Sequence, residues 1–113
     1  MPRTLDDPHF ELDVRPETGG RTTIVVSGEV DIASSRELRD ALTEHLAAGP
    51  VLLDLREVTF MDSSGVAALD RALRDNEGAQ LALCSGLHAN VRQILELTGV
   101  LGVLPFEPCD GEA

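Results

Sequence analysis

The sequence contains no lysine, and all nine of its basic residues are arginines. Without a lysine the chain cannot use a lysine amine as a nucleophile or form a lysine Schiff base, which excludes one class of enzyme. Basic residues are also outnumbered, because 20 aspartates and glutamates leave a net charge of −11 at pH 7. Such a chain is repelled by a phosphate backbone, so we predict no direct binding to nucleic acid.

Cysteine is scarce as well. Cys84 lies in an apolar run and Cys109 in the polar C-terminal segment, and this pair predicts neither a disulfide framework nor a metal site. Such usage favours a reducing cytoplasm. No stretch approaches the ~18 apolar residues that a membrane span needs, and the N-terminus has no apolar core of signal-peptide length. We therefore expect a cytoplasmic protein without membrane insertion.

Catalytic motifs are also missing. The sequence has no Gly-x-Ser-x-Gly elbow, no Walker motif and no glycine loop that would cradle a phosphate, so we predict no cofactor. A hydrolase would use Ser64 or Asp62 as a nucleophile and would need a general base close by. Three histidines could serve as this base, but His9 sits in the N-terminal tail, His45 lies on or beside the buried stripe of the first helix and His88 opens the third helix. Histidines in such positions are more often structural than catalytic. We predict that the protein is not an enzyme.

Length and composition are those of one folded domain. The chain has 113 residues, of which 42% are hydrophobic and 26% are charged, close to the average for globular proteins. Both ends are polar or contain proline. We predict an N-terminal tail at residues 1–8, a single domain at residues 9–107 and a C-terminal tail at residues 108–113.

Hydrophobic patterning predicts five strands. Apolar and acidic residues alternate over residues 10–14, as in an edge strand, and β-branched residues fill residues 22–28, so the two form a hairpin. Residues 51–55 are almost continuously apolar, which is typical of a central strand covered on both faces. Residues 81–84 and 101–106 complete the set.

Three helices are predicted between these strands. Ser34 and Glu37 have the spacing of a capping box, and the helix that follows ends at Gly49. A second helix covers residues 64–75, and a third buries Val91, Ile94 and Leu95 before it stops at Gly99. The order β-β-α-β-α-β-α-β predicts an α/β domain with a mostly parallel sheet, an antiparallel edge strand and helices packed on at least one face.

Polar residues gather where the central strand leads into the second helix. Asp62 or Ser63 can accept hydrogen bonds from the first turn of the helix, and Gly65 leaves room for another backbone. A helix cap with no further role would explain these residues. However, ligands and partners of parallel α/β sheets bind at the carboxyl ends of strands, and the loop with Glu29 and Asp31 leaves a strand at the same edge.

Phe60 and Met61 form an apolar pair directly before this polar cluster. Apolar residues that follow a strand are more often part of the core than exposed. We therefore assign both to packing.

Four segments resemble the STAS family of anti-sigma factor antagonists, and the resemblance covers nearly the whole chain. They are Gly28-Glu29-Val30-Asp31, residues 51–54, residues 58–65 and residues 91–99. The most specific block is Phe60-Met61-Asp62-Ser63-Ser64-Gly65. This resemblance implies the STAS fold for the domain at residues 9–107.

The resemblance also implies a function and its site. Members of the family bind an anti-sigma factor that is also a serine kinase, and this frees a sigma factor; the kinase then phosphorylates the second serine of the motif and ends the interaction. Carried over, the phosphorylated residue is Ser64, and a phosphatase would reset it. The partner-binding residues are Asp62, Ser63, Ser64, Gly65, Glu29 and Asp31. The alternative is a STAS subunit of a stress-sensing assembly or of a transporter complex.

Overall fold

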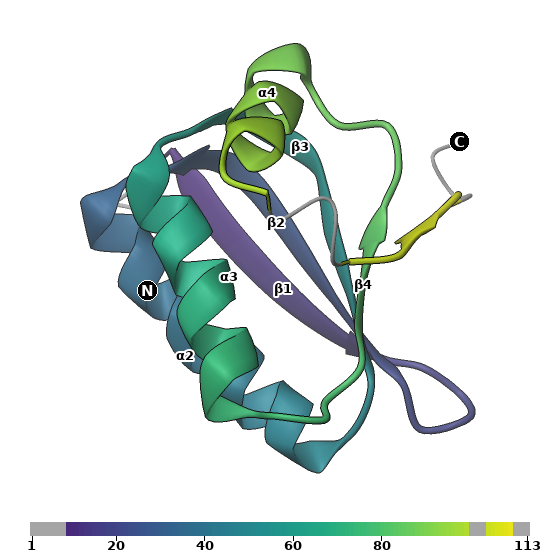
Figure 1. The fold of residues 1–113 in the computed structure, drawn as a ribbon. Helices are drawn as coiled ribbons and strands as arrows, with labels where there is room; N and C mark the ends of the chain where they lie inside the picture. The colour runs from purple at the N-terminus through teal and green to yellow at the C-terminus, as the bar shows by residue number, and fades with distance from the viewer. Residues whose placement is uncertain (1–8, 100–103, 110–113) are drawn as a thin grey trace.

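The computed structural model describes residues 9–99 and 104–109. Within this part of the chain, one sheet has the strand order β1-β2-β3-β4-β5. The strands are β1 (Phe10–Pro16), β2 (Thr22–Val30), β3 (Val51–Met61), β4 (Leu81–Cys84) and β5 (Phe106–Glu107), and the helices are α2 (Ile32–Ala48), α3 (Ser63–Asp75) and α4 (Ala89–Leu97) (Figure 1). The element order is the predicted one.

The sheet is parallel except at one edge. β1 pairs with β2 in antiparallel register, whereas β2 with β3, β3 with β4 and β4 with β5 are parallel. This confirms the predicted hairpin and edge strand. Gly28 makes the close approach of the hairpin strands possible, since its φ is 96° and a Cβ there would lie 1.8 Å from the carbonyl oxygen of His9. Only glycine fits this position.

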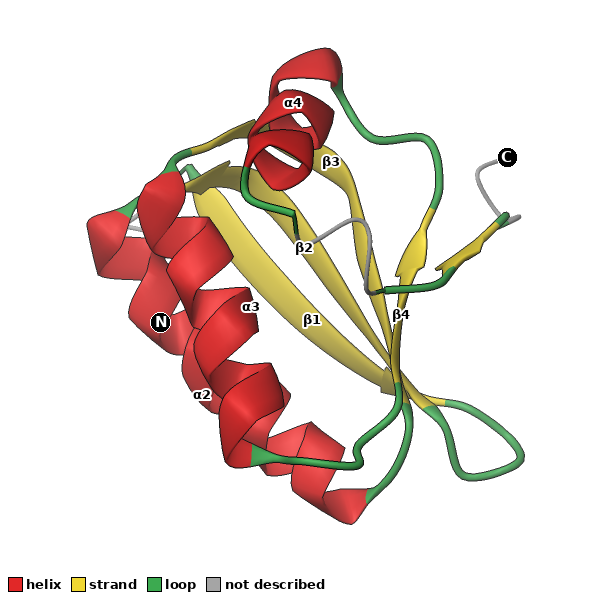
Figure 2. Ribbon diagram, viewed as in Figure 1, coloured by secondary structure: helices red, strands yellow, loops and turns green. Residues whose placement is uncertain are grey.

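The helices cover one face of the sheet (Figure 2). Leu38 and Leu42 of α2, Leu69 of α3 and Leu95 of α4 are fully buried, and they belong to one hydrophobic cluster with the strands. Leu38 and Leu42 are four residues apart, which puts both on the same side of α2. α2 and α3 lie side by side because each follows a neighbouring parallel strand. Val91 and Leu95 are the buried residues of α4 and Ile94 is half-buried, close to prediction.

The C-terminal segment covers part of the opposite face and corrects one prediction. Cys84 and Cys109, expected to form no disulfide, are joined by one with a Cα–Cα distance of 5.5 Å. Cys109 packs there against Leu52, Ala82 and Cys84. The pairing of β5 beside β4 brings Cys109 to Cys84 across 25 residues. The sequence could not reveal this bond because it depends on how the C-terminal segment folds back.

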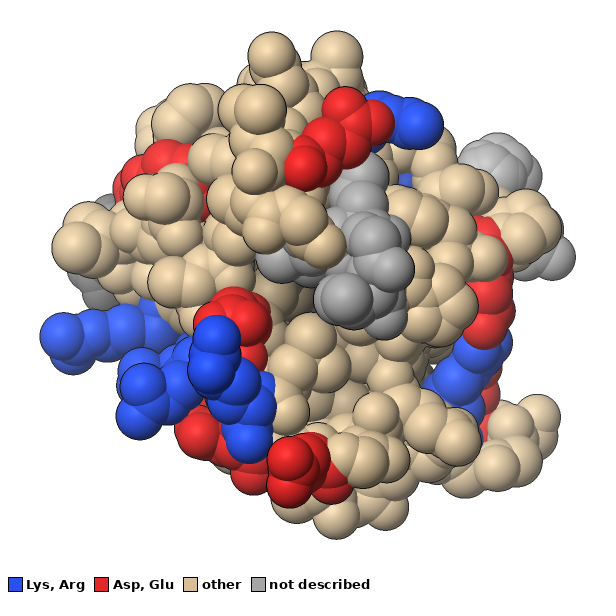
Figure 3. Space-filling view, viewed as in Figure 1, with Lys and Arg blue, Asp and Glu red and all other residues tan. Residues whose placement is uncertain are grey.

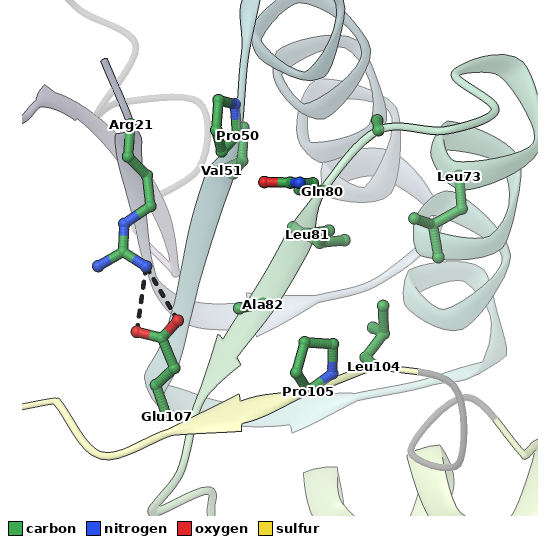
Figure 4. A pocket seen from close by; sticks show the side chains of 11 residues that line it. Arg21, Pro50, Val51, Leu73, Gln80, Leu81, Ala82, Leu104, Pro105 and Glu107 are labelled. Atoms are coloured by element: carbon green, nitrogen blue, oxygen red, sulfur yellow. Dashed lines mark hydrogen bonds and ion pairs between the residues drawn. The ribbon is translucent and has the colours of Figure 1, made fainter. Parts of the chain in front are cut away.

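An ion pair fastens β5 to the other side of the sheet. Arg21, just before β2, donates from Nη1 to both carboxylate oxygens of Glu107 at 3.0 Å (Figure 4). These side chains border a pocket of ≈ 560 Å³ at the amino ends of β3 and β4. Of the strand predicted at residues 101–106, Phe106 lies in β5 (Phe106–Glu107) and residues 104–105 lie outside it. Residues 101–103 are not part of the described structure. None of the described helices is long and apolar enough to cross a membrane.

Candidate functional site

The two loops predicted to share an edge are neighbours in the structure. Val30, the last residue of β2, pairs with Met61, the last residue of β3. The amide of Asp62 donates to the carbonyl of Val30 at 3.2 Å, which ties the loops together. The starts of α2 and α3 are therefore brought side by side at the carboxyl end of the sheet. The predicted site residues all lie in this region.

The cap of α2 is Asp31, not Ser34. The helix begins at Ile32, and Asp31 Oδ1 accepts from the amides of Ala33 and Ser34, both at 3.1 Å. Ser34 completes the capping box from the third position, because its hydroxyl accepts from the amide of Asp31 at 2.9 Å. Both Asp31/Ser34 and Ser34/Glu37 have the spacing of such a box, so spacing alone could not choose between them.

Hydrogen bonding explains the charge state of this cap. The pKa of the Asp31 carboxyl is lowered from its usual value, first by the backbone amide of Ser34 and then by its hydroxyl. Both bonds favour the carboxylate. Asp31 therefore has a structural role whether or not a partner also contacts it. Glu29 is exposed at the end of β2.

Either Asp62 or Ser63 was predicted to cap the second helix, and in the structure Asp62 caps α3. Its Oδ1 accepts from the amide of Ser64 at 2.9 Å, and α3 begins at Ser63. Ser63 is exposed and Ser64 is half-buried. Neither hydroxyl forms a hydrogen bond with a described residue, in contrast to the hydroxyls of Ser34 and Ser35. The cap thus leaves both candidate hydroxyls available.

Ser64 differs from Ser63 in what surrounds it. It lies at one end of a groove of ≈ 590 Å³ between α2 and α3, and Ser63 does not line this groove. Among the described residues, no histidine and no cysteine line it either. Across residues 9–99 and 104–109, no group of His, Cys, Asp and Glu side chains is arranged to hold a metal ion.

Gly65 is buried at the point where α3 rests on the sheet. A Cβ at this position would lie 2.6 Å from Cγ of Met61 and 3.0 Å from Cγ1 of Val30. The sequence predicted room for another backbone, but side chains of the same domain occupy the space. Gly65 thus allows α3 to start close to the ends of β2 and β3.

Phe60 is exposed, so its assignment to the core was wrong, whereas Met61 is buried as expected. The exposed fractions are 44% for Phe60 and 3% for Met61. The cause is a β-bulge: Gly28 pairs with Val58 and Glu29 pairs with Phe60, which leaves Thr59 as an extra residue. The bulge shifts the alternation of side chains, so Val58 and Met61 point inward and Phe60 points out.

A second exposed apolar side chain borders the site. Ile32, the first residue of α2, is 74% exposed and lines the groove with Ser64. Sequence reasoning missed Ile32 and Phe60, because one depends on where α2 begins and the other on the bulge.

Comparison with known proteins places these features in context. Residues 10–113 match the model of the STAS domain. The anti-sigma-B factor antagonist of Listeria monocytogenes is 24% identical over 107 residues, which cover 92% of this chain and 94% of the relative. An anti-sigma factor antagonist from Mycobacterium paratuberculosis has a similar crystal structure, with a TM-score of 0.77 and 23% identity over 91% of this chain and 89% of that one. The Bacillus cell fate determinant SpoIIAA in its phosphorylated form has a TM-score of 0.69 at 19% identity, over 90% and 94% of the two chains.

Proposed function

Since this chain belongs to the STAS-domain family, we propose that it is an anti-sigma factor antagonist. It binds an anti-sigma factor with serine kinase activity, which releases a sigma factor, and phosphorylation of Ser64 ends the binding. A phosphatase acting on phospho-Ser64 restores it. The protein acts as a binding partner in the cytoplasm, where sigma factors work, and not as an enzyme.

The observation that carries the proposal is the state of Ser64. The residue is partly exposed and its hydroxyl forms no hydrogen bond with a described residue, although the backbone beside it is fixed by the Asp62 cap. A kinase therefore meets an acceptor held in place at the start of a helix, and no contact within the domain has to break. The names of the relatives support this proposal, since two are anti-sigma factor antagonists and a third has been solved in a phosphorylated form.

The surface around Ser64 supports a protein partner. Ile32 supplies an exposed apolar side chain in the same groove as Ser64, and Asp62, Ser63, Glu29 and Asp31 supply polar groups at this edge of the sheet. Apolar anchors surrounded by polar groups are the usual composition of protein interfaces.

A phosphate on Ser64 would oppose binding through charge. Phosphoserine carries about −1.5 to −2 charges at pH 7, and it would be attached two residues from the Asp62 carboxylate. The amino end of α3 offsets part of this charge, so the domain tolerates the phosphate. A partner that packs over the hydroxyl cannot accommodate the phosphate in the same way. Loss of one buried polar contact costs about 2–5 kcal/mol, or roughly 30-fold to several thousand-fold in affinity.

Two variants test the switch once the partner has been found by purifying the tagged protein from its host. Ser64→Ala should bind the kinase and accept no phosphate, since the lost hydroxyl makes no contact inside the domain. Ser64→Asp should weaken binding by about 30-fold or more. Isothermal titration calorimetry measures the affinities, and mass spectrometry of mapped peptides locates the phosphate.

Ser63→Ala is the matched control, because Ser63 also has a free hydroxyl but lies outside the groove. It should still be phosphorylated at Ser64. Phosphate on Ser63 alone, or equal affinity of the wild type and Ser64→Asp, contradicts the proposed switch. Co-purification of transporter or stress-assembly subunits with an unmodified Ser64 would instead identify the protein as another STAS binding module.

A further inference from the structure

The groove that ends at Ser64 is lined by arginines from both of its helices. Arg36 and Arg39 project from α2, and Arg71 and Arg74 project from α3. We call this feature the arginine groove. Figure 3 shows basic side chains gathered on the surface over α2 and α3, with acidic side chains beside them. The proposed switch serine and the arginine groove therefore belong to one continuous surface.

Charge in the arginine groove is opposite to that of the rest of the protein. The chain has nine basic residues and a net charge of −11, yet four of the nine line this groove and Asp70 is the one carboxylate among its lining residues. Random placement in so acidic a protein would leave the groove negative. Segregated charge of this kind determines which partners approach and in which orientation.

Helix stability does not explain the arrangement. Arg74 pairs with Asp70 at 2.7 Å and Arg71 pairs with Asp75 at 3.3 Å along α3. Such exposed pairs contribute only about 0.3–0.5 kcal/mol each, and they do not require all four arginines to face one groove. Like charges across a groove repel one another, which opposes the packing of α2 against α3. Three of the four arginines contact an aspartate, which offsets this repulsion, so helix pairing accounts for their single charges but not for the position of all four at one groove.

Arg36 in particular has its charge uncompensated. It is exposed, and it forms no ion pair with any residue in the described part of the chain. Arg39 has a distant contact of 3.5 Å with Asp40. A partner with carboxylates can engage these guanidinium groups without first breaking a strong bond, and arginine binds carboxylates in bidentate geometry.

From these observations we propose that the arginine groove docks an acidic segment of the anti-sigma factor, which rests on the function proposed above. Because Ser64 lines one end of this groove, a partner docked there lies beside the Ser64 surface. The basic area is short, since Asp40, Glu44 and Asp75 line the hollow at the far end of the groove. Such an area suits a few carboxylates of a folded protein and not a long nucleic acid, whose phosphates would meet the acidic remainder of the surface.

Docking of this kind would give the phosphate a second effect. Phospho-Ser64 adds about −1.5 to −2 charges at one end of the arginine groove. The groove loses much of its attraction for an acidic segment at the moment the phosphate is attached. The switch would thus combine lost contact at Ser64 with weaker electrostatic attraction along α2 and α3.

The test compares charge reversals in and away from the arginine groove. Binding to the anti-sigma factor kinase identified by co-purification is measured by surface plasmon resonance for the wild type and Arg36→Glu/Arg39→Glu. We expect the double variant to bind ~10-fold to 100-fold more weakly, mainly through slower association, and to show a smaller dependence of Kd on salt. Arg92→Glu is the control, because Arg92 lies on α4 and pairs with Glu96 there.

The outcomes separate this inference from the proposed function. If the wild type binds no anti-sigma factor, both are overturned. If the wild type binds and the double variant binds equally well, or if Arg92→Glu weakens binding as much, only the docking of an acidic segment is overturned. Circular dichroism of each variant confirms that the fold is unchanged, and a selective loss in the double variant supports the inference.

Discussion

Space around Gly65 determines how close α3 can start to the sheet. A Cβ added to Gly65 would lie 2.6 Å from Cγ of Met61 and 3.0 Å from its Sδ and from Val30. These groups are buried and belong to the main cluster, so they have little room to move. The residue therefore affects the position of Ser64 even though it is itself buried.

Gly65→Ala should destabilise the protein for this reason. Overpacking of a buried site typically costs about 1–3 kcal/mol. Urea denaturation followed by circular dichroism measures the change in the free energy of unfolding. The sign of the effect is informative, since replacing an exposed helix glycine with alanine would stabilise by up to about 1 kcal/mol. A stabilised Gly65→Ala variant would contradict the tight packing.

Within single elements, the sequence predicted type and order well but not every boundary. The alternation in β1 and the apolar run of β3 are strong local signals, and both strands formed as expected. β3 continues to Met61, however, beyond the predicted residues 51–55. The bulge at Thr59 depends on how β3 pairs with β2, and the first residue of α2 depends on which side chain caps the helix. The local sequence pattern predicts neither the pairing nor the cap.

The Asp31 cap should stabilise the start of α2 by a measurable amount. Asp31→Ala should lower the free energy of unfolding by about 1 kcal/mol, because the amides of Ala33 and Ser34 lose their acceptor. Asp31→Asn is the matched control, since its side-chain oxygen can still accept, and it should cost much less. Thermal unfolding of the three proteins at pH 7 measures this difference. An equal cost for both variants would mean that the charge, and not the cap, stabilises the helix.

The pH dependence of the same comparison follows from the lowered pKa of Asp31. A carboxyl whose pKa is lower in the folded state stabilises the protein above its unfolded pKa, whose ordinary value is 3.8. This contribution is lost as the pH falls through the folded pKa. The difference in the free energy of unfolding between the wild type and Asp31→Ala should therefore be constant at neutral pH and should become smaller below pH 3.8.

Across the whole molecule, features that join distant segments escaped prediction. The sequence placed Glu29, Asp31 and Asp62 in two loops and correctly predicted that a parallel sheet would bring the loops to one edge. It could not show that four arginines from α2 and α3 face one groove, because that depends on how the two helices are rotated against the sheet. The bond between Cys84 and Cys109 is another such feature.

The disulfide should raise the melting temperature of the whole domain. Cys84 and Cys109 are 25 residues apart, and in the loop-entropy account a crosslink of that span stabilises by about 3.5 kcal/mol. The oxidised protein should therefore melt roughly 10 °C or more above the reduced protein. Differential scanning calorimetry with and without dithiothreitol measures this shift. Cys109→Ser is the control, since it should melt near the reduced wild type and should not respond to the reductant.

The disulfide also bears on whether the protein can act in the cytoplasm, as proposed. Cytoplasmic thiols are kept reduced, so the function proposed above has to proceed without this crosslink. The disulfide lies with Leu52 and Ala82, apart from the main cluster that contains the helices. Reduction should thus leave the affinity for the proposed partner, an anti-sigma factor, unchanged while it lowers the melting temperature. A loss of affinity on reduction, reproduced by Cys109→Ser, would show instead that the bond between β4 and the C-terminal segment supports the Ser64 surface.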